Sequence, residues 1–322
     1  MTTQLSVGEP RPVHIAVTIV VCTRNRGHKL GVCLASIALA IQNGKDLIET
    51  IIVDNGSTDD TRLIAQKWAA SFPAPVQVLS ENRPGLAIAR NTAIRHARGS
   101  LIVFTDDDCE LSSDYFNKLS SNYSRDDVPI IRGGAVERGN LEDIEFTTKR
   151  DPKPSRLLDI TNVGGFVLGC NMIVPREALV RLGPFDERFG AGAIFRSGED
   201  TDLICRAYLA GVPVEYVPDM VVFHYHGRRA STDVRKLYFG YCIGNGAIYA
   251  KYGFASMRLL RHFYWDSRNA VLELFGGSQF QPDLGLTYRR TVLGNIWGMG
   301  LYVLERFRLF VKFTKQDTEA VH

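Results

Sequence analysis

Three consecutive aspartates after an apolar segment are the residues best suited to bind a metal ion. Asp106, Asp107 and Asp108 follow the strand-like run Leu101–Phe104 after a single threonine. Side chains alternate along a strand, so Asp106 and Asp108 are expected to point the same way. Their hard oxygens suit Mg²⁺ or Mn²⁺, which bind a few carboxylates together with substrate phosphates. The alternative is a solvated acidic turn, but three adjacent like charges repel one another without a cation.

Three more acids open a predicted helix in the segment SGEDTDL, residues 197–203. Because the N-terminus of a helix dipole stabilises negative charge, Glu199, Asp200 and Asp202 are expected to stay ionised at neutral pH. An ionised carboxylate beside a reacting carbon is what a base-assisted displacement requires. The alternative is an acidic first turn that stabilises the helix and takes no part in chemistry.

Two further polar groups follow apolar segments. Asp54 comes at the end of a predicted strand, where its carboxylate can accept hydrogen bonds from a base or a ribose. A glycine turn followed by a helix that Ser57 caps is the alternative there. His224 and His226 follow an apolar run, and one imidazole can complete a metal site, although lone histidines are more often structural.

The sequence lacks the phosphate loops of two large nucleotide-binding classes. Neither GxGxxG after the first strand nor GxxxxGK[ST] occurs, which argues against dinucleotide-binding and Walker-type sites. A metal ion can instead neutralise a diphosphate leaving group. The six cysteines form no CxxC pair, and the N-terminal segment has no basic-then-apolar signal pattern. We therefore expect reduced thiols and a cytoplasmic location.

Short β-branched runs alternate with helical patterns over the first part of the chain, which predicts an α/β fold with a mostly parallel central sheet. In such sheets ligands bind at the carboxyl ends of the strands. The segments Thr23–Arg26 and Asp106–Asp108, together with Asp54, all follow strands and are expected to meet at one edge. The expected strands are His14–Val21, Glu49–Val53, Val76–Leu79 and Leu101–Phe104, and the expected helices are Leu30–Ile41, Asp59–Ala70 and Leu86–His96.

The second part of this region is less regular. A polar stretch, Arg138–Asn162, is expected to form a long, mobile connection. Strand signals end near Gly227–Ser231, so we divide the chain into a catalytic domain, residues 1–230, and a helical C-terminal region, residues 231–322. Before that boundary the pattern predicts helices at Arg176–Leu182 and Thr201–Ala210 and strands at Pro213–Val217 and Met220–Phe223.

The C-terminal region differs from the rest of the chain in charge. The preceding part carries 24 basic and 28 acidic side chains, whereas from Gly227 onward there are 14 and 7. The segments Arg258–Phe275 and Thr291–Phe313 mix aromatic residues with arginines, and their apolar runs are shorter than the ~20 residues that span a bilayer. This pattern favours a helix lying in a membrane interface. Gly294 and Gly298 are spaced for close helix contact. A pair of helices packed on the catalytic domain is the alternative.

Seven segments occur in an order and spacing that resemble one known family. They are VCTRNR, IIVDNGSTDDT, NRPGLAIARNTAI, IVFTDDDCE, LGCNMIVPREALVRLGPFDERF, SGEDTDLICRAYLAG and VVFHYHG. From about Ile15 to Gly227 they resemble the catalytic domain of family 2 glycosyltransferases. The resemblance implies the GT-A type of α/β fold. It also implies an inverting transfer of a sugar from a nucleotide-diphosphate sugar to an acceptor hydroxyl.

The resemblance implies roles for individual residues. Asp200 matches the general base, and Asp108 and His224 match residues that reach the metal. The family often has two acids where this chain has Asp54 and Asn55, which leaves the preference for the base open. The residues that match the donor side are Thr23, Arg26, Asp54, Arg90, Asp106 and Asp107.

The family also implies the ligands. They are Mg²⁺ or Mn²⁺, a nucleotide-sugar donor that is most often UDP-linked, and a saccharide or lipid-linked acceptor in polysaccharide or glycolipid synthesis. We expect no nucleic-acid partner, and we predict peripheral membrane contact through the C-terminal region. One alternative, a nucleotidyltransferase, would need a Gly-rich, Arg-bearing loop directly after the first strand, which Thr23–Gly27 does not supply. The other, a non-catalytic scaffold, would have no need for intact acidic pairs.

Overall fold

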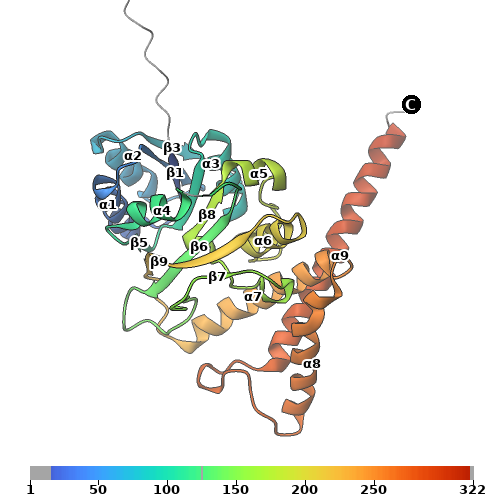
Figure 1. The fold of residues 1–322 in the computed structure, drawn as a ribbon. Helices are drawn as coiled ribbons and strands as arrows, with labels where there is room; N and C mark the ends of the chain where they lie inside the picture. The colour runs from blue at the N-terminus through green and yellow to red at the C-terminus, as the bar shows by residue number, and fades with distance from the viewer. Residues whose placement is uncertain (1–15, 125, 320–322) are drawn as a thin grey trace, which may run out of the picture.

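The computed structural model describes residues 16–124 and 126–319. These residues form a nine-stranded sheet. Figure 1 shows that a helical extension follows the sheet toward the C-terminus. The strands lie in the order β3-β2-β1-β4-β8-β6-β9-β5, and β7 also pairs with β9. The strands are β1 (Val17–Thr23), β2 (Ile48–Asp54), β3 (Val76–Ser80), β4 (Leu101–Asp106), β5 (Cys109–Leu111), β6 (Ile131–Arg138), β7 (Ser155–Arg156), β8 (Met172–Pro175) and β9 (Val214–His224).

The helices fall into two groups. Six belong to the part of the chain that carries the sheet: α1 (Gly27–Asn43), α2 (Thr61–Ser71), α3 (Leu86–His96), α4 (Tyr115–Tyr123), α5 (Arg176–Leu182) and α6 (Glu199–Leu209). Three form the extension: α7 (Ser231–Tyr252), α8 (Arg261–Leu274) and α9 (Tyr288–Glu319). No helix in residues 16–124 or 126–319 combines the length and the apolar character that a membrane span requires.

The first half of the sheet is parallel, as predicted. β1 pairs in parallel with β2 and β4, and β2 pairs in parallel with β3. Helices cover both faces, so β1 and β2 are buried almost throughout and do not alternate between apolar and polar residues. The register sets Thr23 opposite Asp54 and Cys22 opposite Asp106. The polar residues that follow these strands therefore meet at one edge, as the sequence predicted.

The second half makes the sheet mixed, because β8 is antiparallel to both β4 and β6, and β5 is antiparallel to β9. The two strands predicted at 213–217 and 220–223 are one irregular strand, β9. Its pairing with β6 shifts from Gly134↔Val217 to Ala135↔Val221. Pro218 lies in this shift and has no N–H to donate to the ladder. A Cβ on Gly134 would lie 2.0 Å from the Met220 carbonyl oxygen, so only glycine fits there.

Three local predictions need correction or adjustment. The first strand begins at Val17 and runs to Thr23, and the predicted start at His14 lies outside the described residues. Ser57 does not cap α2, since its Oγ accepts a hydrogen bond from the Asn25 N–H, 3.0 Å away. The connection Arg138–Asn162 is not loop throughout, because it contains β7, which pairs with β9.

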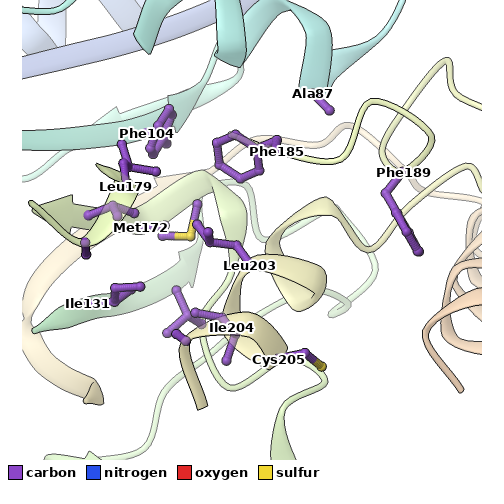
Figure 2. Packing of buried hydrophobic residues seen from close by; sticks show 14 of the residues in the cluster. Ala87, Phe104, Ile131, Met172, Leu179, Phe185, Phe189, Leu203, Ile204 and Cys205 are labelled. Carbon is purple, nitrogen blue, oxygen red and sulfur yellow. The ribbon is translucent and has the colours of Figure 1, made fainter. Parts of the chain in front are cut away.

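Two hydrophobic cores lie on the two faces of the sheet, because alternate residues of β1 enter different clusters. Val20 belongs to one cluster, and Ile19 and Val21 to the other. Figure 2 shows the first cluster, where Phe104 of β4 faces Phe185. The two rings meet edge to face with centroids 5.3 Å apart. This core lies directly beneath the edge that carries the polar residues.

The extension is held together by close contact between α7 and α9. A Cβ on Gly298 would lie 2.0 Å from the Ile243 carbonyl oxygen, and one on Gly246 would lie 1.9 Å from the Asn295 carbonyl oxygen. A Cβ on Gly294 would lie 2.5 Å from the Cβ of Cys242. The close helix contact predicted for Gly294 and Gly298 is therefore confirmed. Figure 1 shows α9 crossing α7 and continuing away from the sheet.

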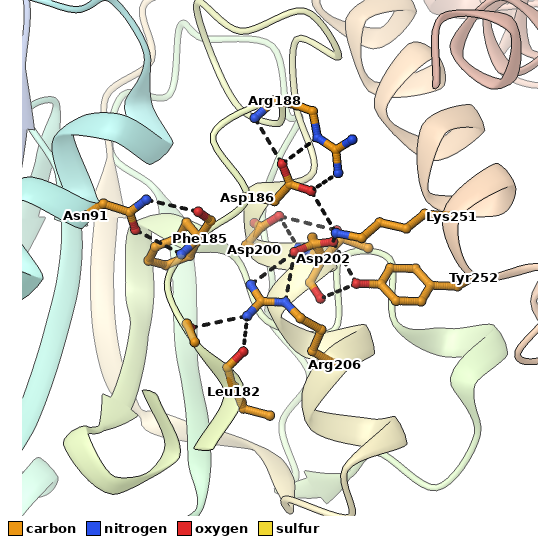
Figure 3. Close-up of polar contacts among 12 residues, drawn as sticks. Asn91, Leu182, Phe185, Asp186, Arg188, Asp200, Asp202, Arg206, Lys251 and Tyr252 are labelled. Carbon is orange, nitrogen blue, oxygen red and sulfur yellow. Dashed lines mark hydrogen bonds and ion pairs between the residues drawn. The ribbon is translucent and has the colours of Figure 1, made fainter. Parts of the chain in front are cut away.

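A charged network joins the extension to α6 (Figure 3). Lys251 of α7 places its Nζ 2.5 Å from Oδ1 of Asp202 and 2.8 Å from Oδ2 of Asp186. The Tyr252 hydroxyl donates to Asp202 over 2.7 Å. Asp202 is fully buried and also accepts from Arg206 Nε over 3.0 Å. We therefore propose that the boundary near residue 230 marks a change in secondary structure and not a break between independent units.

Replacing Lys251 by methionine is expected to lower the free energy of unfolding by about 3 kcal/mol, because two carboxylates, one of them fully buried, lose their shared cation. Burial opposes ionisation of Asp186, but hydrogen bonds from Arg188 and Lys251 outweigh it and lower the pKa of that carboxyl. A lowered pKa stabilises the fold above the ordinary pKa of an aspartate, and this stabilisation is lost as the pH falls below it. Urea unfolding at pH 7 and at pH 3 measures both effects. Lys236→Met, on an exposed position of the same helix, is the control. Equal losses in the two variants at pH 7 would contradict a role for the network.

Candidate functional site

A cavity of about 1010 Å³ opens at the carboxyl ends of β1, β2 and β4. It is bounded by the strand ends, the segment 161–170, the start of α6 and the helices α7 and α8. Asp54 does not line it, although its neighbour Asn55 does. Eight of the nine predicted site residues do line it: Thr23, Arg26, Arg90, Asp106, Asp107, Asp108, Asp200 and His224. The tertiary structure thus gathers most of the predicted site into one cavity.

Asp108 and His224 form the part of the cavity that fits a metal ion. Pairing of β5 with β9 sets Cys109 opposite His224, so the preceding Asp108 brings Oδ1 to 3.4 Å from the His224 Nε2. The Cys109 thiol lies in the same cluster, but burial raises its pKa well above the ordinary value, so it stays protonated. The Asp108 carboxylate suits Mn²⁺ or Mg²⁺, the His224 imidazole suits Mn²⁺ better than Mg²⁺, and a neutral thiol suits neither.

Charges around this pair set its protonation. Burial opposes a charge on His224, but the hydrogen bond and the charge of Asp108 outweigh it and raise the pKa of His224 to about 9. Burial likewise opposes ionisation of Asp108, but His224, Arg26 and Lys29 lower its pKa. Arg26 Nη1 lies 3.5 Å from Asp108 Oδ2 and Lys29 Nζ lies 3.8 Å from it. Without a metal, protein cations thus balance the carboxylate.

The orientation of Asp106 and Asp108 does not come from strand alternation, contrary to the prediction from the sequence. β4 ends at Asp106, and Asp107 and Asp108 lie in a turn before β5. Asp106 instead turns toward Arg90, whose Nη2 lies 3.4 Å from its Oδ1. Burial, reinforced by Asp108 and Asp106, raises the pKa of Asp107 to about 6. The three aspartates therefore have three different environments.

Arg90 joins the two acidic segments of the site. Its side chain is 2% exposed and lies over the rings of Phe104 and Phe185, each 5.6 Å from the guanidinium carbon. Nη1 donates to Glu199 Oε1 over 3.0 Å, and Nη2 donates to the Gly169 carbonyl over 2.9 Å. Burial and the charge of Asp200 raise the pKa of Glu199 to about 7, although Arg90 opposes the rise. Arg90 thus holds the end of β4 next to the start of α6.

Asp200 is the acid of the α6 segment that presents a carboxylate to the cavity without a cationic partner among the described residues. Its Oδ2 accepts from the Gly169 N–H over 2.9 Å, and its Oδ1 accepts from the Thr201 N–H over 2.6 Å. Glu199 also lines the cavity but is paired with Arg90. Asp202 points away into the network with Lys251. The structure therefore distinguishes three acids that the sequence left equivalent.

The remaining predicted residues lie around the end of β1. The Thr23 hydroxyl is buried beside Asp107 and opposes the rise in the pKa of that carboxyl. Asp54 is buried, and its Oδ1 accepts from the Ser57 N–H over 3.1 Å. The Asn55 amide donates to the carbonyls of Glu81 and Arg83 and accepts from the Gly85 N–H, so it shapes the wall of the cavity.

His226 has a structural role. Its Nδ1 accepts from the Arg228 N–H over 2.9 Å, which leaves Nε2 to donate to the Ile144 carbonyl, 3.1 Å away. Burial, assisted by the charge of His224, lowers the pKa of His226. The neutral ring therefore fixes the segment after β9, and His224 alone of the two histidines lines the cavity.

The extension contributes residues to the cavity that were not predicted from the sequence. The polar and aromatic ones are Tyr238, Tyr241, Asn245, Tyr249, His262, Asp266 and Phe280, and the apolar ones are Leu237, Ile248 and Leu259. The signal was present, since the α7 members recur at spacings of three or four residues. The predicted domain boundary near residue 230 assigned these residues to a separate C-terminal region, so they were not considered as part of the site.

Comparisons with known proteins point to one family. A family model described as Glycosyl transferase family 2 matches residues 18–183. "Glycosyltransferase AglE" of Haloferax volcanii is 24% identical over 212 residues, 65% of this chain and 66% of that protein. "Succinoglycan biosynthesis protein ExoM" of Rhizobium meliloti is 23% identical over 205 residues, 63% of this chain and 64% of that protein. The matches thus span just under two thirds of the length of these relatives.

The fold has a counterpart among solved structures. "Mannosyltransferase PcManGT from Pyrobaculum calidifontis in complex with GDP-Man and Mn2+" is 19% identical and superimposes with a TM-score of 0.52. The superposition covers 98% of this chain and 85% of that one. At this identity the likeness concerns the fold alone, and it confirms the predicted GT-A type of α/β fold.

Proposed function

The chain belongs to glycosyl transferase family 2, and we propose that it is an inverting glycosyltransferase that moves a sugar from a nucleotide-diphosphate sugar to an acceptor hydroxyl. The observation that carries this proposal is one cavity that joins Asp108 and His224 to Asp200. The donor is UDP-linked by preference, and the product belongs to polysaccharide or glycolipid synthesis. The name of one relative, a succinoglycan biosynthesis protein, supports the latter part.

Asp108 and His224 are proposed to hold Mg²⁺ or Mn²⁺. When bound, the ion supplies positive charge to the diphosphate as negative charge develops on it. The protein adds cations of its own at this place, since Arg26 lines the cavity and Lys29 lies within 3.8 Å of Asp108. The structurally similar mannosyltransferase is described as a complex with Mn²⁺, which supports a divalent ion here.

The nucleotide is proposed to lie at the end of β1, between Thr23 and Asp106, which both line the cavity, whereas Asp54 is buried next to it and does not line it. The Thr23 side chain and the Asp106 carboxylate both line the cavity, where a ribose can reach them. For Arg90 we propose a role other than the donor contact that the family resemblance implies. Because its guanidinium is buried and already donates to protein oxygens, we propose that it positions Asp106 and Glu199 and does not contact the nucleotide directly.

Asp200 is proposed to act as the general base. The two backbone N–H groups that donate to it fix the direction of its carboxylate. The acceptor oxygen attacks the anomeric carbon while its proton passes to Asp200, and the bond from that carbon to the diphosphate oxygen breaks. A nucleoside diphosphate leaves, and the single displacement inverts the anomeric centre.

The proposed function is tested by thermal unfolding with a panel of nucleotide sugars, with and without Mn²⁺. A ligand that binds the folded state at 100 times its Kd stabilises it by about 2.7 kcal/mol. We expect one nucleotide class, UDP first, to raise the melting temperature only with Mn²⁺ present, and matching transfer or hydrolysis products to appear by chromatography. The proposal fails if no nucleotide sugar in the UDP, dTDP or GDP series stabilises the protein or is turned over.

The extension is proposed to contact a membrane surface. One face of α9 packs on α7 through its glycines, and the other exposes a stripe of apolar residues at helical spacing. Exposed arginines lie at both ends of the stripe, including Arg289 and Arg308, which pair with Glu273 and Glu305. The stripe consists of Leu293, Ile296, Trp297, Val303, Leu304 and Phe307, and α8 with the residue that follows it adds Tyr264, Trp265, Val271, Leu272 and Phe275. An apolar stripe between cations suits the surface of an anionic bilayer.

We expect the full chain to sediment with vesicles that contain phosphatidylserine. Each Lys or Arg near such a surface contributes up to about 1 kcal/mol and is screened by salt, whereas apolar insertion is not. Binding should therefore weaken but persist at high salt. Trp297→Ser with Phe307→Ser should abolish the salt-resistant part, and Val32→Ser with Leu63→Ser, also exposed apolar positions, should not. Absence of binding to anionic vesicles would mean that the stripe contacts protein instead. A chain truncated near residue 231 would lose the ion pair between Lys251 of α7 and Asp202 of α6. Substitutions are therefore a better test than truncation.

A further inference from the structure

The end of the cavity away from the strand edge is built by α7 and α8. Six α7 residues line it, and four of them, the polar and aromatic ones, recur every three or four positions and so share one side of the helix. The two from α8 are one turn apart and likewise share a side. We call this surface the tyrosine face; it consists of Tyr238, Tyr241, Asn245, Tyr249, His262 and Asp266.

Most polar groups of the tyrosine face lack protein partners. Tyr238 donates to or accepts from Thr291 Oγ1 at 3.1 Å. Within residues 16–124 and 126–319, the other five members, Tyr241, Asn245, Tyr249, His262 and Asp266, make no side-chain hydrogen bond or ion pair. These side chains are half-buried or exposed and line the cavity, so their polar groups are available to a ligand.

The combination of groups indicates the chemistry of that ligand. Tyr238 stacks on Phe280 with ring centroids 5.5 Å apart and planes at 20°, which makes a flat aromatic platform in the wall of the cavity. A sugar ring has an apolar C–H face that packs on such rings, and hydroxyls around its rim that bond to carboxylate, amide, imidazole and phenol groups. A purely apolar chain would leave these polar groups unpaired, at a cost of about 1–3 kcal/mol each.

The charge of the tyrosine face favours a neutral sugar over an anionic ligand. Asp266 is the one acid of the tyrosine face, and that face contains neither an arginine nor a lysine. The carboxylate would repel a phosphate or sulfate placed on this face. Arg228, Asp200 and Glu199 are close enough to Tyr241 for their charges to influence the pKa of its hydroxyl. The tyrosine face thus begins beside the proposed base and runs away from it into a region suited to uncharged hydroxyls.

We propose that the tyrosine face binds the acceptor, and that the acceptor presents a neutral saccharide to it. This rests on the proposed function, since the reacting hydroxyl must lie at the inner end of the face, where its proton passes to Asp200. The extension then has two surfaces, the tyrosine face toward the cavity and the apolar stripe of α8 and α9 toward the outside. Specificity for the acceptor is set by α7 and α8 and not by the strand edge that holds the donor.

The test uses the full chain and a panel of neutral disaccharides as p-nitrophenyl glycosides, of the maltose, cellobiose, lactose and chitobiose types. Binding is followed by saturation-transfer NMR and titration calorimetry, so no turnover is needed. We expect at least one glycoside to bind through its ring protons. Asp266→Leu and Tyr241→Leu should each weaken binding by about 10-fold to 100-fold, as expected for loss of one hydrogen bond to a charged group or of one stacked ring.

Controls separate this proposal from the proposed function. Asp283→Leu, at an exposed site outside the cavity, should leave binding unchanged. Asp108→Ala should lose donor turnover yet still bind the glycoside, and Asp266→Leu should raise the acceptor KM while donor hydrolysis stays intact. Tyr241→Phe, which keeps the ring, serves if Tyr241→Leu unfolds. The proposal is overturned if no glycoside binds, if both leucine variants bind as well as the native chain, or if a phosphorylated sugar binds more tightly than its neutral counterpart.

Discussion

Replacing Asp108 by alanine is expected to reduce sugar transfer by about 10³-fold or more, the largest loss from any single change in the site. Asp108 is the carboxylate that faces His224, and together they form the pair best suited to a divalent ion. Without it the diphosphate loses the positive charge that stabilises it as it leaves. The loss should appear mainly in kcat. Affinity for Mn²⁺ in the presence of nucleotide, measured by calorimetry or electron paramagnetic resonance, should fall in parallel.

The stability of this variant needs its own control, because alanine also removes the partner of His224 and Arg26. Asp108→Asn keeps a hydrogen-bond acceptor and should fold like the native chain while still losing metal affinity. Asp114→Ala, at an exposed position before α4 with no side-chain cap, should retain full activity and metal binding. Undiminished transfer by Asp108→Ala in excess EDTA would exclude the proposed metal role.

Asp200→Asn is expected to lower turnover by roughly 10²–10⁴, the usual contribution of general-base catalysis. Asparagine keeps the shape of the side chain but cannot take up the proton of the acceptor hydroxyl. Affinity for the donor should be retained, because the Asp200 carboxylate accepts hydrogen bonds from the Gly169 and Thr201 N–H groups and forms no ion pair with the residues proposed to bind the donor. Steady-state kinetics with separate donor and acceptor titrations distinguish the two effects.

Two outcomes would reassign the residue. Loss of nucleotide affinity in Asp200→Asn would make it a ligand contact, and unchanged turnover would pass the role to Glu199. Asp202 is no longer a candidate, since it is buried against Lys251 and Tyr252. Asp233→Asn is the matched control, because Asp233 also lies in the first turn of a helix but is exposed and away from the cavity.

The local periodicity of the sequence was sufficient for the parallel half of the fold. β-branched runs and helical spacing located β1 to β4 and α1 to α3 within a few residues, because these elements pack against neighbours close in the chain. The local periodicity gave a wrong result for β9, which we predicted as two separate strands. There the pairing with β6 depends on Gly134, a residue more than 80 positions earlier whose missing side chain admits the Met220 carbonyl.

The family, the order of the strand and helix units, and the acidic segments at a strand end and a helix start could all be read from the sequence. The separate roles of the acids depend on contacts between distant parts of the chain. Glu199, Asp200 and Asp202 lie within one turn of α6 and differ in direction because a helix turns about 100° per residue. The rotation of that helix is set by Arg90, 109 positions from Glu199, and by Lys251, 49 positions from Asp202. Contacts across such separations leave no periodic trace in the sequence, and for the same reason the sequence did not reveal that α7 and α8 complete the cavity.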